Sequence, residues 1–316
     1  MAKTPDSRRP KSRRDKAPPQ TLNTASTKGA GRSGDKSSSR NDKNAPRGEK
    51  PGRGGKRQQR RPSGKAIGNA LWIYGRHAAL AALANPRRVI TAVRATESFV
   101  DTREDDLAAA RRARPDAGDW SIELAHGQVL QRMLGDGAVH QGIAVQTRPL
   151  EQPDIAEIRS INDRSVVLAL DQATDPRNVG AAIRAAAAFG AHAVITTARS
   201  APPESGALAK AAAGALEQLA YVRAPNLARA LDNLKENGFW TIGLAGEAET
   251  PISDAPFDRP TAIVIGAEGS GLRRLTLEHC DAAVYIPMTP LVESLNLATA
   301  AAIALYEKSR ANTKLS

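Results

Sequence analysis

The chain contains a single cysteine, Cys280, among its 316 residues. A disulfide within the chain is therefore excluded, and such sparse cysteine usage is typical of a protein kept in a reducing cytoplasm. His279 precedes Cys280, but neighbours in sequence rarely reach the geometry of a Cys–His nucleophile, so we interpret Cys280 as a core residue. No two Cys or His residues show the spacing of zinc ligands, and we expect no metal site.

The sequence also lacks long apolar segments and phosphate-binding motifs. No run approaches the roughly 18 apolar residues of a membrane-spanning helix, and no signal-peptide core is present, so we expect a cytoplasmic protein without membrane contact. A Gly-x-Gly-x-x-Gly turn after the first strand and a Gly-Lys-Ser/Thr motif are both missing. Nicotinamide dehydrogenases, P-loop ATPases and other α/β nucleotide-binding enzymes of that kind are therefore disfavoured.

Apolar residues are nearly absent from the first 66 positions, which contain no Val, Ile, Phe, Trp or Tyr and only one Leu. Such a segment cannot bury enough apolar area to offset chain entropy, and we predict a disordered tail over residues 1–68. Three aspartates, Asp6, Asp15 and Asp35, argue against an organellar transit peptide.

Positive charge is concentrated in the same segment. Residues 1–66 hold 20 Lys and Arg against 5 Asp and Glu, whereas the remaining 250 residues hold 25 against 28. A basic tail suits the phosphate backbone of RNA, because each neutralised phosphate releases counterions. A purely solubilising tail is the alternative interpretation.

Alternating strand and helix patterns begin near Leu71. Residues 69–148 form a first α/β unit, in which an alanine-rich helix stops at Asn85–Pro86 and residues 101–114 form a helix with acids first and bases last. Residues 149–163 are predicted to be a linker.

A second α/β unit follows over residues 164–316. It opens with a strand at 165–171 whose interior is entirely apolar, which is typical of a parallel sheet covered on both faces. Further strands alternate with helices, among them helices predicted over residues 205–219 and 295–310. The alternation predicts an α/β fold with a doubly wound, mostly parallel sheet.

Three segments of this second unit combine polar residues with glycine- or proline-containing turns. They are Asp175–Gly190, Val264–Leu272 and Tyr285–Glu307. Turns at the carboxyl ends of strands are candidate binding sites, because open α/β sheets bind ligands at that edge. In the second segment three glycines within six residues, Gly266 to Gly271, permit close approach of the backbone to a ligand.

The polar residues of these segments each have a structural interpretation beside a functional one. Asn178 is placed as the N-cap of the helix that Gly190 ends. Arg184, about 9 Å further along the helix axis, is either a solvated charge or a contact for an anionic substrate. Ser294 and Asn296 are good helix-start residues, so a capping role competes with a catalytic one.

Together, Asn-x-Gly-x-x-x-Arg, Gly-Ala-Glu-Gly-x-Gly-Leu and Ile-Pro-Met-x-x-x-Val-x-Ser-Leu-Asn resemble the three motifs of the SpoU/TrmH family. These are S-adenosylmethionine-dependent RNA ribose 2′-O-methyltransferases of the SPOUT superfamily. The resemblance covers residues 165–316, and within the family the chain is most similar to the 23S rRNA (guanosine-2′-O-)methyltransferases. The unit from Leu71 to Arg148 resembles the family's substrate-binding domain, which is similar to ribosomal protein L30e.

The resemblance implies a C-terminal trefoil knot that holds S-adenosylmethionine, a homodimer, and RNA as the partner. A sulfonium methyl group is already electrophilic, so the reaction requires no metal; the enzyme aligns the ribose oxygen and removes its proton. By position, the cofactor contacts are Gly266, Ile286 and Leu295, with Leu244, Gly246 and Met288 as neighbours. The implied catalytic set is Arg184, Asn178, Glu268, Ser294 and Asn296.

Arg184 raises a chemical difficulty, because the family's mechanism gives it the role of base. A guanidinium loses its proton only above about pH 12. Orienting the nucleotide phosphate or stabilising the emerging alkoxide is an equal alternative for Arg184. The chain also has Ala298 where the family often has Ser, so Thr299 must supply that hydroxyl if it contacts substrate.

Two other functions remain open at this point. A tRNA methyltransferase would use the same chemistry, and the added L30e-like unit favours rRNA only by analogy. A noncatalytic RNA-binding or ribosome-assembly factor on the same scaffold is the second alternative. The joint presence of Asn178, Arg184, Glu268 and Asn296 argues against an inactive enzyme.

Overall fold

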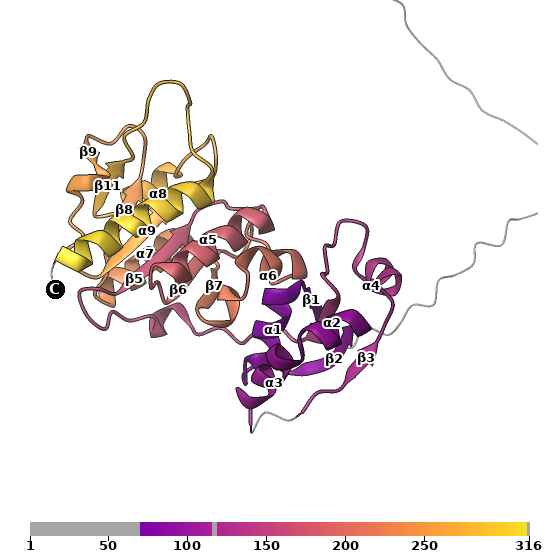
Figure 1. Cartoon of the computed structure of the whole chain (residues 1–316). Coiled ribbons are helices and arrows are strands. Elements are labelled where there is room, and N and C mark those ends of the chain that lie inside the picture. The colour runs from indigo at the N-terminus through magenta and orange to yellow at the C-terminus, as the bar shows by residue number, and fades with distance from the viewer. Residues whose placement is uncertain (1–69, 116–118, 315–316) are drawn as a thin grey trace, which may run out of the picture. The chain divides into compact units, whose positions relative to one another are not determined.

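The computed structural model describes residues 70–115 and 119–314, and these belong to one compact unit of the chain (Figure 1). The predicted tail over residues 1–68 lies outside the described residues. Within them the fold is α/β, with one sheet of four strands and one of seven. No helix in the described ranges is both long and apolar enough to cross a bilayer.

The four-stranded sheet is mixed, in the order β1-β4-β2-β3, with β4 antiparallel to both of its neighbours. Its strands are β1 (Leu71–Tyr74), β2 (Ile90–Ala95), β3 (Ile122–Leu124) and β4 (Ile143–Thr147). The helices associated with it are α1 (Arg76–Ala84), α2 (Glu97–Thr102), α3 (Glu104–Arg112) and α4 (Gly127–Leu134). The predicted helix over residues 101–114 is therefore wrong as a single element, because Arg103 leaves the helical region at φ −131° and separates α2 from α3.

A short connection follows, with one 3₁₀ turn at Ile155–Glu157, and leads into the seven-stranded sheet. The order is β7-β6-β5-β10-β8-β11-β9, and every neighbouring pair is parallel, as the alternating pattern predicts. The strands are β5 (Val166–Leu170), β6 (Ala193–Thr197), β7 (Ala220–Ala224), β8 (Trp240–Leu244), β9 (Thr250–Pro251), β10 (Thr261–Ile265) and β11 (Ala282–Tyr285). All residues of β5, β6 and β10 are buried, which explains why apolar residues predominate in these strands.

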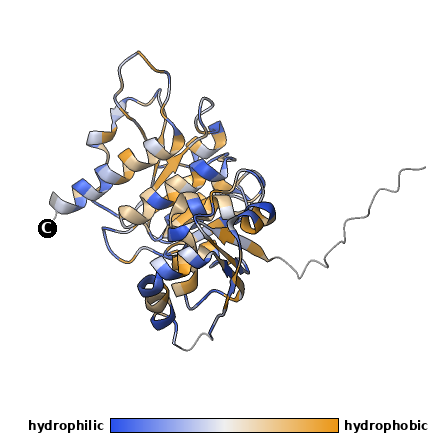
Figure 2. Ribbon diagram, turned by 45° about the vertical axis from the view of Figure 1, so that its right-hand side comes forward, coloured by the Kyte–Doolittle hydropathy of each residue, from blue (hydrophilic) through white to orange (hydrophobic). Residues whose placement is uncertain are grey.

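Helices cover the two faces of this sheet, and Figure 2 shows the hydrophobic strands enclosed between them. The helices α5 (Pro176–Ala188), α6 (Gly206–Ala212) and α9 (Leu297–Lys314) share one core cluster, whereas α7 (Leu227–Glu236) packs into the other. A short α8 (Arg274–Glu278) follows β10. Gly180 lets α5 and α6 approach closely, because a Cβ there would lie 2.6 Å from the Leu208 carbonyl oxygen.

Two predicted helix boundaries of the C-terminal half are wrong. The helix expected over residues 205–219 stops at Ala212, since Ala213 and Gly214 take left-handed conformations at φ 51° and 94° and a 3₁₀ turn at Ala215–Glu217 follows. The last helix starts at Leu297, two residues later than predicted, and continues to Lys314. Its start is set by Asn296, whose side chain accepts from the Ala298 amide at 2.9 Å.

Candidate functional site

The three polar segments meet at the carboxyl edge of the seven-stranded sheet. The side-chain amide of Asn178, on α5, donates to Glu268 Oε1 at 3.0 Å, and Glu268 lies in the turn after β10. The amide of Asn296, at the start of α9, donates to the same oxygen at 2.6 Å and to Asn178 Oδ1 at 3.0 Å. These three residues, which we term the Asn–Glu–Asn cluster, are separated by up to 118 positions in sequence.

Capping explains how each asparagine reaches the cluster. Asp175, and not Asn178 as predicted, is the N-cap of α5, since its carboxylate accepts from the Arg177 amide at 2.8 Å and Pro176 opens the helix. The Asn178 side chain is thereby left to contact Glu268. Asn296 does both jobs, as its Oδ1 caps α9 while its Nδ2 joins the cluster.

Two of the five predicted catalytic residues lie outside this hydrogen-bonded set. Arg184 is exposed on α5, and its side chain makes no hydrogen bond or ion pair within the described ranges. Ser294 is also exposed and lies beside a cavity, without the capping bond that its position suggested. The roles of all five residues stay predictions.

An apolar cavity of about 150 Å³ opens next to the cluster, and a second of about 290 Å³ continues it toward Glu268. Leu295, Gly246 and Gly266 line both. The first cavity contains all six positions predicted to contact or neighbour the cofactor: Leu244, Gly246, Gly266, Ile286, Met288 and Leu295. The structure thus brings together side chains from three separate turns, after β8, β10 and β11.

The turn after β10 is folded tightly back on itself. The Gly271 amide donates to the Ala267 carbonyl at 3.0 Å, and Gly269 and Gly271 take positive φ angles of 79° and 64°. At Gly266 a Cβ would lie 2.0 Å from the carbonyl carbon of Gly271, so no side chain fits there. The glycines are therefore required by the shape of the turn that forms one wall of the cavities.

A buried carboxylate anchors this turn, and sequence reasoning missed it. Asp171, fully buried at the end of β5, accepts from Arg273 Nη2 at 2.7 Å and from Thr276 Oγ1 at 2.7 Å. It also accepts from the backbone amide of Arg273 at 3.2 Å. An acidic residue ending an apolar strand was visible in the sequence, but its partners lie more than 100 positions away.

Chemically, the site offers a carboxylate and two amides in fixed positions beside an apolar cavity. Within the described residues no group of three or more His, Cys, Asp or Glu side chains is arranged to hold a metal ion. Burial raises the pKa of the nearby Cys280 thiol to about 12, which makes it a poor nucleophile at neutral pH.

Comparison with known proteins places this geometry in context. Residues 165–306 match the SpoU rRNA Methylase family, and residues 72–153 match the family of RNA 2′-O ribose methyltransferase substrate binding domains. The chain is 38% identical over 246 residues to a 23S rRNA (guanosine-2′-O-)-methyltransferase RlmB from Salmonella typhi, covering 76% of this chain and 98% of that protein. It is 37% identical over 246 residues to RlmB from Escherichia coli K12, covering 75% and 97%.

Solved structures share the fold. An AdoMet-bound rRNA methyltransferase from Sinorhizobium meliloti superposes with a TM-score of 0.64 at 21% identity, covering 77% of this chain and 88% of that chain. The SpoU methyltransferase AviRb from Streptomyces viridochromogenes, in complex with AdoMet, gives a TM-score of 0.65 at 22% identity, covering 78% and 92%. The family matches, together with the match to the RlmB proteins over almost their whole length, show that the chain belongs to the SpoU rRNA methylase family.

Proposed function

We propose that this protein transfers a methyl group from S-adenosylmethionine to a ribose 2′-hydroxyl of RNA, with a guanosine of 23S rRNA as the substrate. The observation that carries the proposal is the Asn–Glu–Asn cluster, whose Glu268 lines the cavity that continues the apolar one. Relatives that this chain matches along almost their entire length carry that activity in their names.

The residues that line the cavity suit S-adenosylmethionine. Leu244, Ile286 and Leu295 offer apolar surface for an adenine ring, and Met288 is 45% exposed beside them. Gly246 has open space where a Cβ would stand, so the backbone of this turn is accessible to a ligand. When bound, the cofactor supplies an electrophilic sulfonium methyl group, and the chain's own residues supply alignment.

In the proposed reaction the cluster positions the ribose. Glu268 Oε1 accepts three hydrogen bonds, from Asn178, Asn296 and the Leu297 amide at 3.2 Å, which fixes the start of α9 against the turn after β10. Alignment of this kind lowers the barrier by fixing reactants before reaction. Asn178 and Asn296 are then held for contact with the ribose hydroxyls.

Arg184 acts in this proposal through its charge. It orients a nucleotide phosphate or stabilises the alkoxide that forms as the 2′-proton leaves, two roles that suit a guanidinium cation. Its exposure on α5 leaves the guanidinium accessible to RNA. The Arg184→Ala protein should lose methyl transfer while its cofactor affinity survives; full activity in that protein would remove Arg184 from the site.

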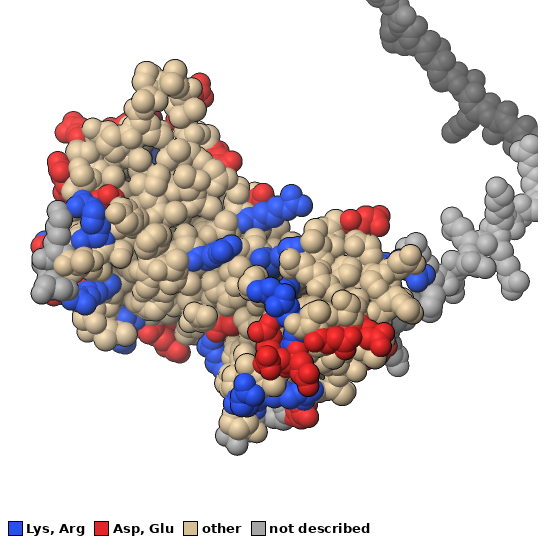
Figure 3. Space-filling view, viewed as in Figure 1, with Lys and Arg blue, Asp and Glu red and all other residues tan. Residues whose placement is uncertain are grey.

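We further propose a homodimer formed over α5, α9 and the loop that precedes α9. Leu291, Val292 and Tyr306 are 87%, 55% and 53% exposed there. Figure 3 shows that this face carries few charged side chains. Sedimentation of the full chain would test the dimer. The trefoil knot is proposed from the family resemblance, and the turns after β8, β10 and β11, which line the cavity, are where it would lie.

The direct test of function is 2′-O-methyl mapping of total RNA from a strain lacking this protein, with complementation by the wild-type chain and by Arg184→Ala. Loss of one methyl group in 23S rRNA that only the wild type restores is the expected result. Loss in a tRNA would replace the rRNA substrate by tRNA. If no RNA changed its methylation and a titration showed no cofactor binding, the proposed function would be wrong, and a noncatalytic RNA-binding factor would be the remaining hypothesis.

A further inference from the structure

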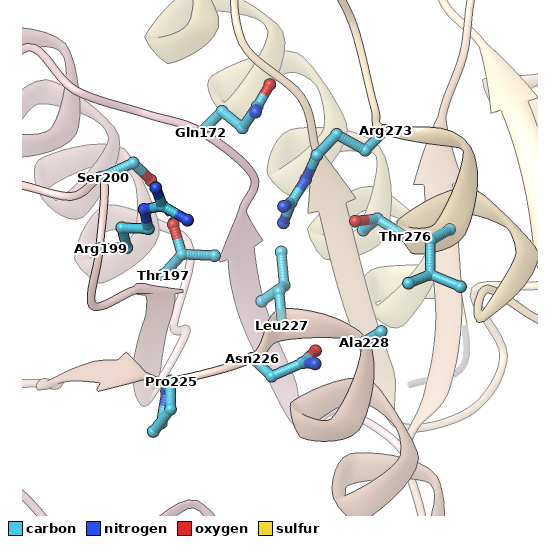
Figure 4. Close-up of a pocket in the computed structure, with 11 residues that line it drawn as sticks. Gln172, Thr197, Arg199, Ser200, Pro225, Asn226, Leu227, Ala228, Arg273 and Thr276 are labelled. Atoms are coloured by element: carbon cyan, nitrogen blue, oxygen red, sulfur yellow. Dashed lines mark hydrogen bonds between the residues drawn. The ribbon is translucent and has the colours of Figure 1, made fainter.

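A separate cavity of about 480 Å³ lies at the same carboxyl edge of the seven-stranded sheet as the Asn–Glu–Asn cluster. It is walled by the turns after β5, β6 and β7 and by the segment that follows the glycine turn of β10. In Figure 4, Arg199 and Arg273 reach into this space from opposite sides. None of the residues that line it is acidic, so the cavity is a concave site of positive charge.

The two arginines are held differently. Arg273 is fixed by the buried Asp171, to which its Nη2 and Nε donate at 2.7 and 3.0 Å, and its charge is largely balanced there. Arg199 is exposed, and its side chain makes no hydrogen bond or ion pair within the described part of the chain. Arg199 therefore supplies the uncompensated positive charge of the cavity.

The turn that carries Arg199 is well anchored. Arg223 Nη2 donates to the carbonyl oxygens of Ala198 and Ala201 at 2.7 and 3.2 Å, on either side of Arg199 and Ser200. Across the cavity, Gln172 adopts a left-handed conformation at φ 56°. Such strained conformations in residues other than glycine cluster at functional sites.

The start of α7 adds to the positive potential of the cavity. Leu227 and Ala228, the first residues of this ten-residue helix, line the cavity, and the Asn226 side chain caps the Arg229 amide at 3.2 Å. The first backbone N–H groups of a helix, and its dipole, favour a negatively charged group. Arginine forks and a helix start together match the oxygens of a phosphate.

The cavity and the cluster are joined by two short chain segments. Gln172 precedes Asn178 by six positions, and Arg273 follows Glu268 by five. Five residues span at most about 18 Å, so one short stretch of a nucleic-acid strand can reach both places. We infer that this cavity binds a backbone phosphate of the substrate RNA, next to the methylated nucleotide, through Arg199 and Arg273. The inference rests on the proposed function, because it takes RNA as the substrate.

Arg199→Gln is the most informative variant, because changing Arg273 would leave the buried Asp171 without its cationic partner. Loss of one charge-assisted contact should weaken binding of a substrate RNA hairpin by the full chain about tenfold. The slope of log Kd against log salt should fall by about 0.7–0.9, the amount expected for one phosphate contact. Cofactor affinity and melting temperature should not change.

The matched control is Arg159→Gln. Arg159 is likewise exposed, but it precedes β5 and therefore lies toward the opposite edge of the sheet. This variant should bind RNA as the wild type does at every salt concentration. An equal loss in both variants would mean a nonspecific effect of net charge and would overturn the site.

A chemically modified RNA locates the contact. Methylphosphonate replaces one phosphate at a time in the hairpin and removes its charge. At one position near the target ribose, the wild type should lose about tenfold in affinity while Arg199→Gln loses nothing further. Additive losses at every position, or an Arg199→Gln protein with wild-type affinity and salt slope, would overturn the inference.

Two further outcomes separate neighbouring explanations. Thermal stabilisation of the wild type, but not of Arg199→Gln, by millimolar inorganic phosphate, with RNA affinity unchanged, would identify a free-anion site and overturn the RNA assignment. If the wild-type protein transferred no methyl group, the proposed function would be refuted but the RNA contact would not. The RNA contact would still stand if Arg199→Gln weakened binding in that case, because the binding measurement needs no turnover.

Discussion

Arg88 and Glu217 form a buried ion pair that connects the four-stranded sheet to the 3₁₀ turn after α6. Arg88 Nη2 lies 2.7 Å from Glu217 Oε1, with the two side chains 0% and 6% exposed. Arg88 Nη1 also lies 2.5 Å from Glu204, whose pKa is raised by burial. The Asn85 amide completes the set by donating to Glu217 at 2.7 Å. These contacts join the two α/β units, that of the four-stranded sheet and that of the seven-stranded sheet.

Replacing Arg88 by Met should lower the free energy of unfolding by about 3–5 kcal/mol, since two buried carboxylates would lose the cation that balances their charge. Chemical denaturation measures this. The control is the triple variant Arg88→Met, Glu204→Gln, Glu217→Gln, which removes both charges and should recover much of the loss. Equal stability of Arg88→Met and the wild type would show that the pair does not join the units.

Glu268 is expected to position Asn178 and Asn296 without itself accepting the proton. In Glu268→Gln one amide oxygen can still accept the three hydrogen bonds, though more weakly than a carboxylate. We expect kcat to fall about tenfold in Glu268→Gln and more than a hundredfold in Glu268→Ala, measured by methyl incorporation at saturating RNA. If Gln were as inactive as Ala, Glu268 would be the base.

The parallel sheet and the alternation of elements could be predicted from sequence, because fully buried strands such as β5 and β10 are almost wholly apolar. Local details, such as which of two residues caps a helix, were harder to predict. Asp175 and Asn178 are both good capping residues, and only the fold shows that Asp175 caps α5 and frees Asn178 for Glu268. The break at Ala213 is equally hidden, since an alanine-rich run predicts an unbroken helix.

Long-range partners account for most of what sequence could not supply. The six cofactor positions were placed by family resemblance and do line one cavity, although their contacts with a cofactor stay predictions. Asp171 and Arg88 were not singled out at all. A buried charge is recognisable only when its partner is known, and here the partners, Arg273 and Glu217, lie 102 and 129 positions away.

Gly266→Ala should abolish cofactor binding. A Cβ at this position would lie 2.0 Å from the Gly271 carbonyl carbon and 2.3 Å from the Leu272 amide nitrogen, both backbone atoms that cannot move aside. The turn would have to open, and the wall of the cavity with it. Isothermal titration with S-adenosylmethionine checks this. Gly137→Ala, which meets no atom within 4 Å and, like Gly266, has no positive φ, is the control for the glycine-to-alanine change without the clash. Wild-type affinity in Gly266→Ala would show that the turn is not part of the binding site.

Lys308 predicts a dependence of stability on alkaline pH. Its side chain is fully buried on α9, where Nζ donates to the carbonyl oxygens of Asp163, Phe257 and Arg259 at 2.7–2.9 Å. Burial outweighs the attraction of Asp163 and Asp258 and lowers the pKa of Lys308 to about 8.

Between pH 8 and the ordinary value of 10.5, the unfolded chain therefore holds a proton at Lys308 that the folded chain has lost. Stability depends on pH through the difference in bound protons, so the contribution of this group rises with pH across that window and is flat below it. In Lys308→Met, stability should be lower by about 1–3 kcal/mol at pH 7, because three carbonyl oxygens, that of Phe257 buried, lose their donor. The difference between the two proteins, measured by denaturation at pH 7, 8, 9 and 10, should then grow with pH. A difference that stays constant across the series would contradict a lowered pKa, and one that shrinks would require a pKa above 10.5.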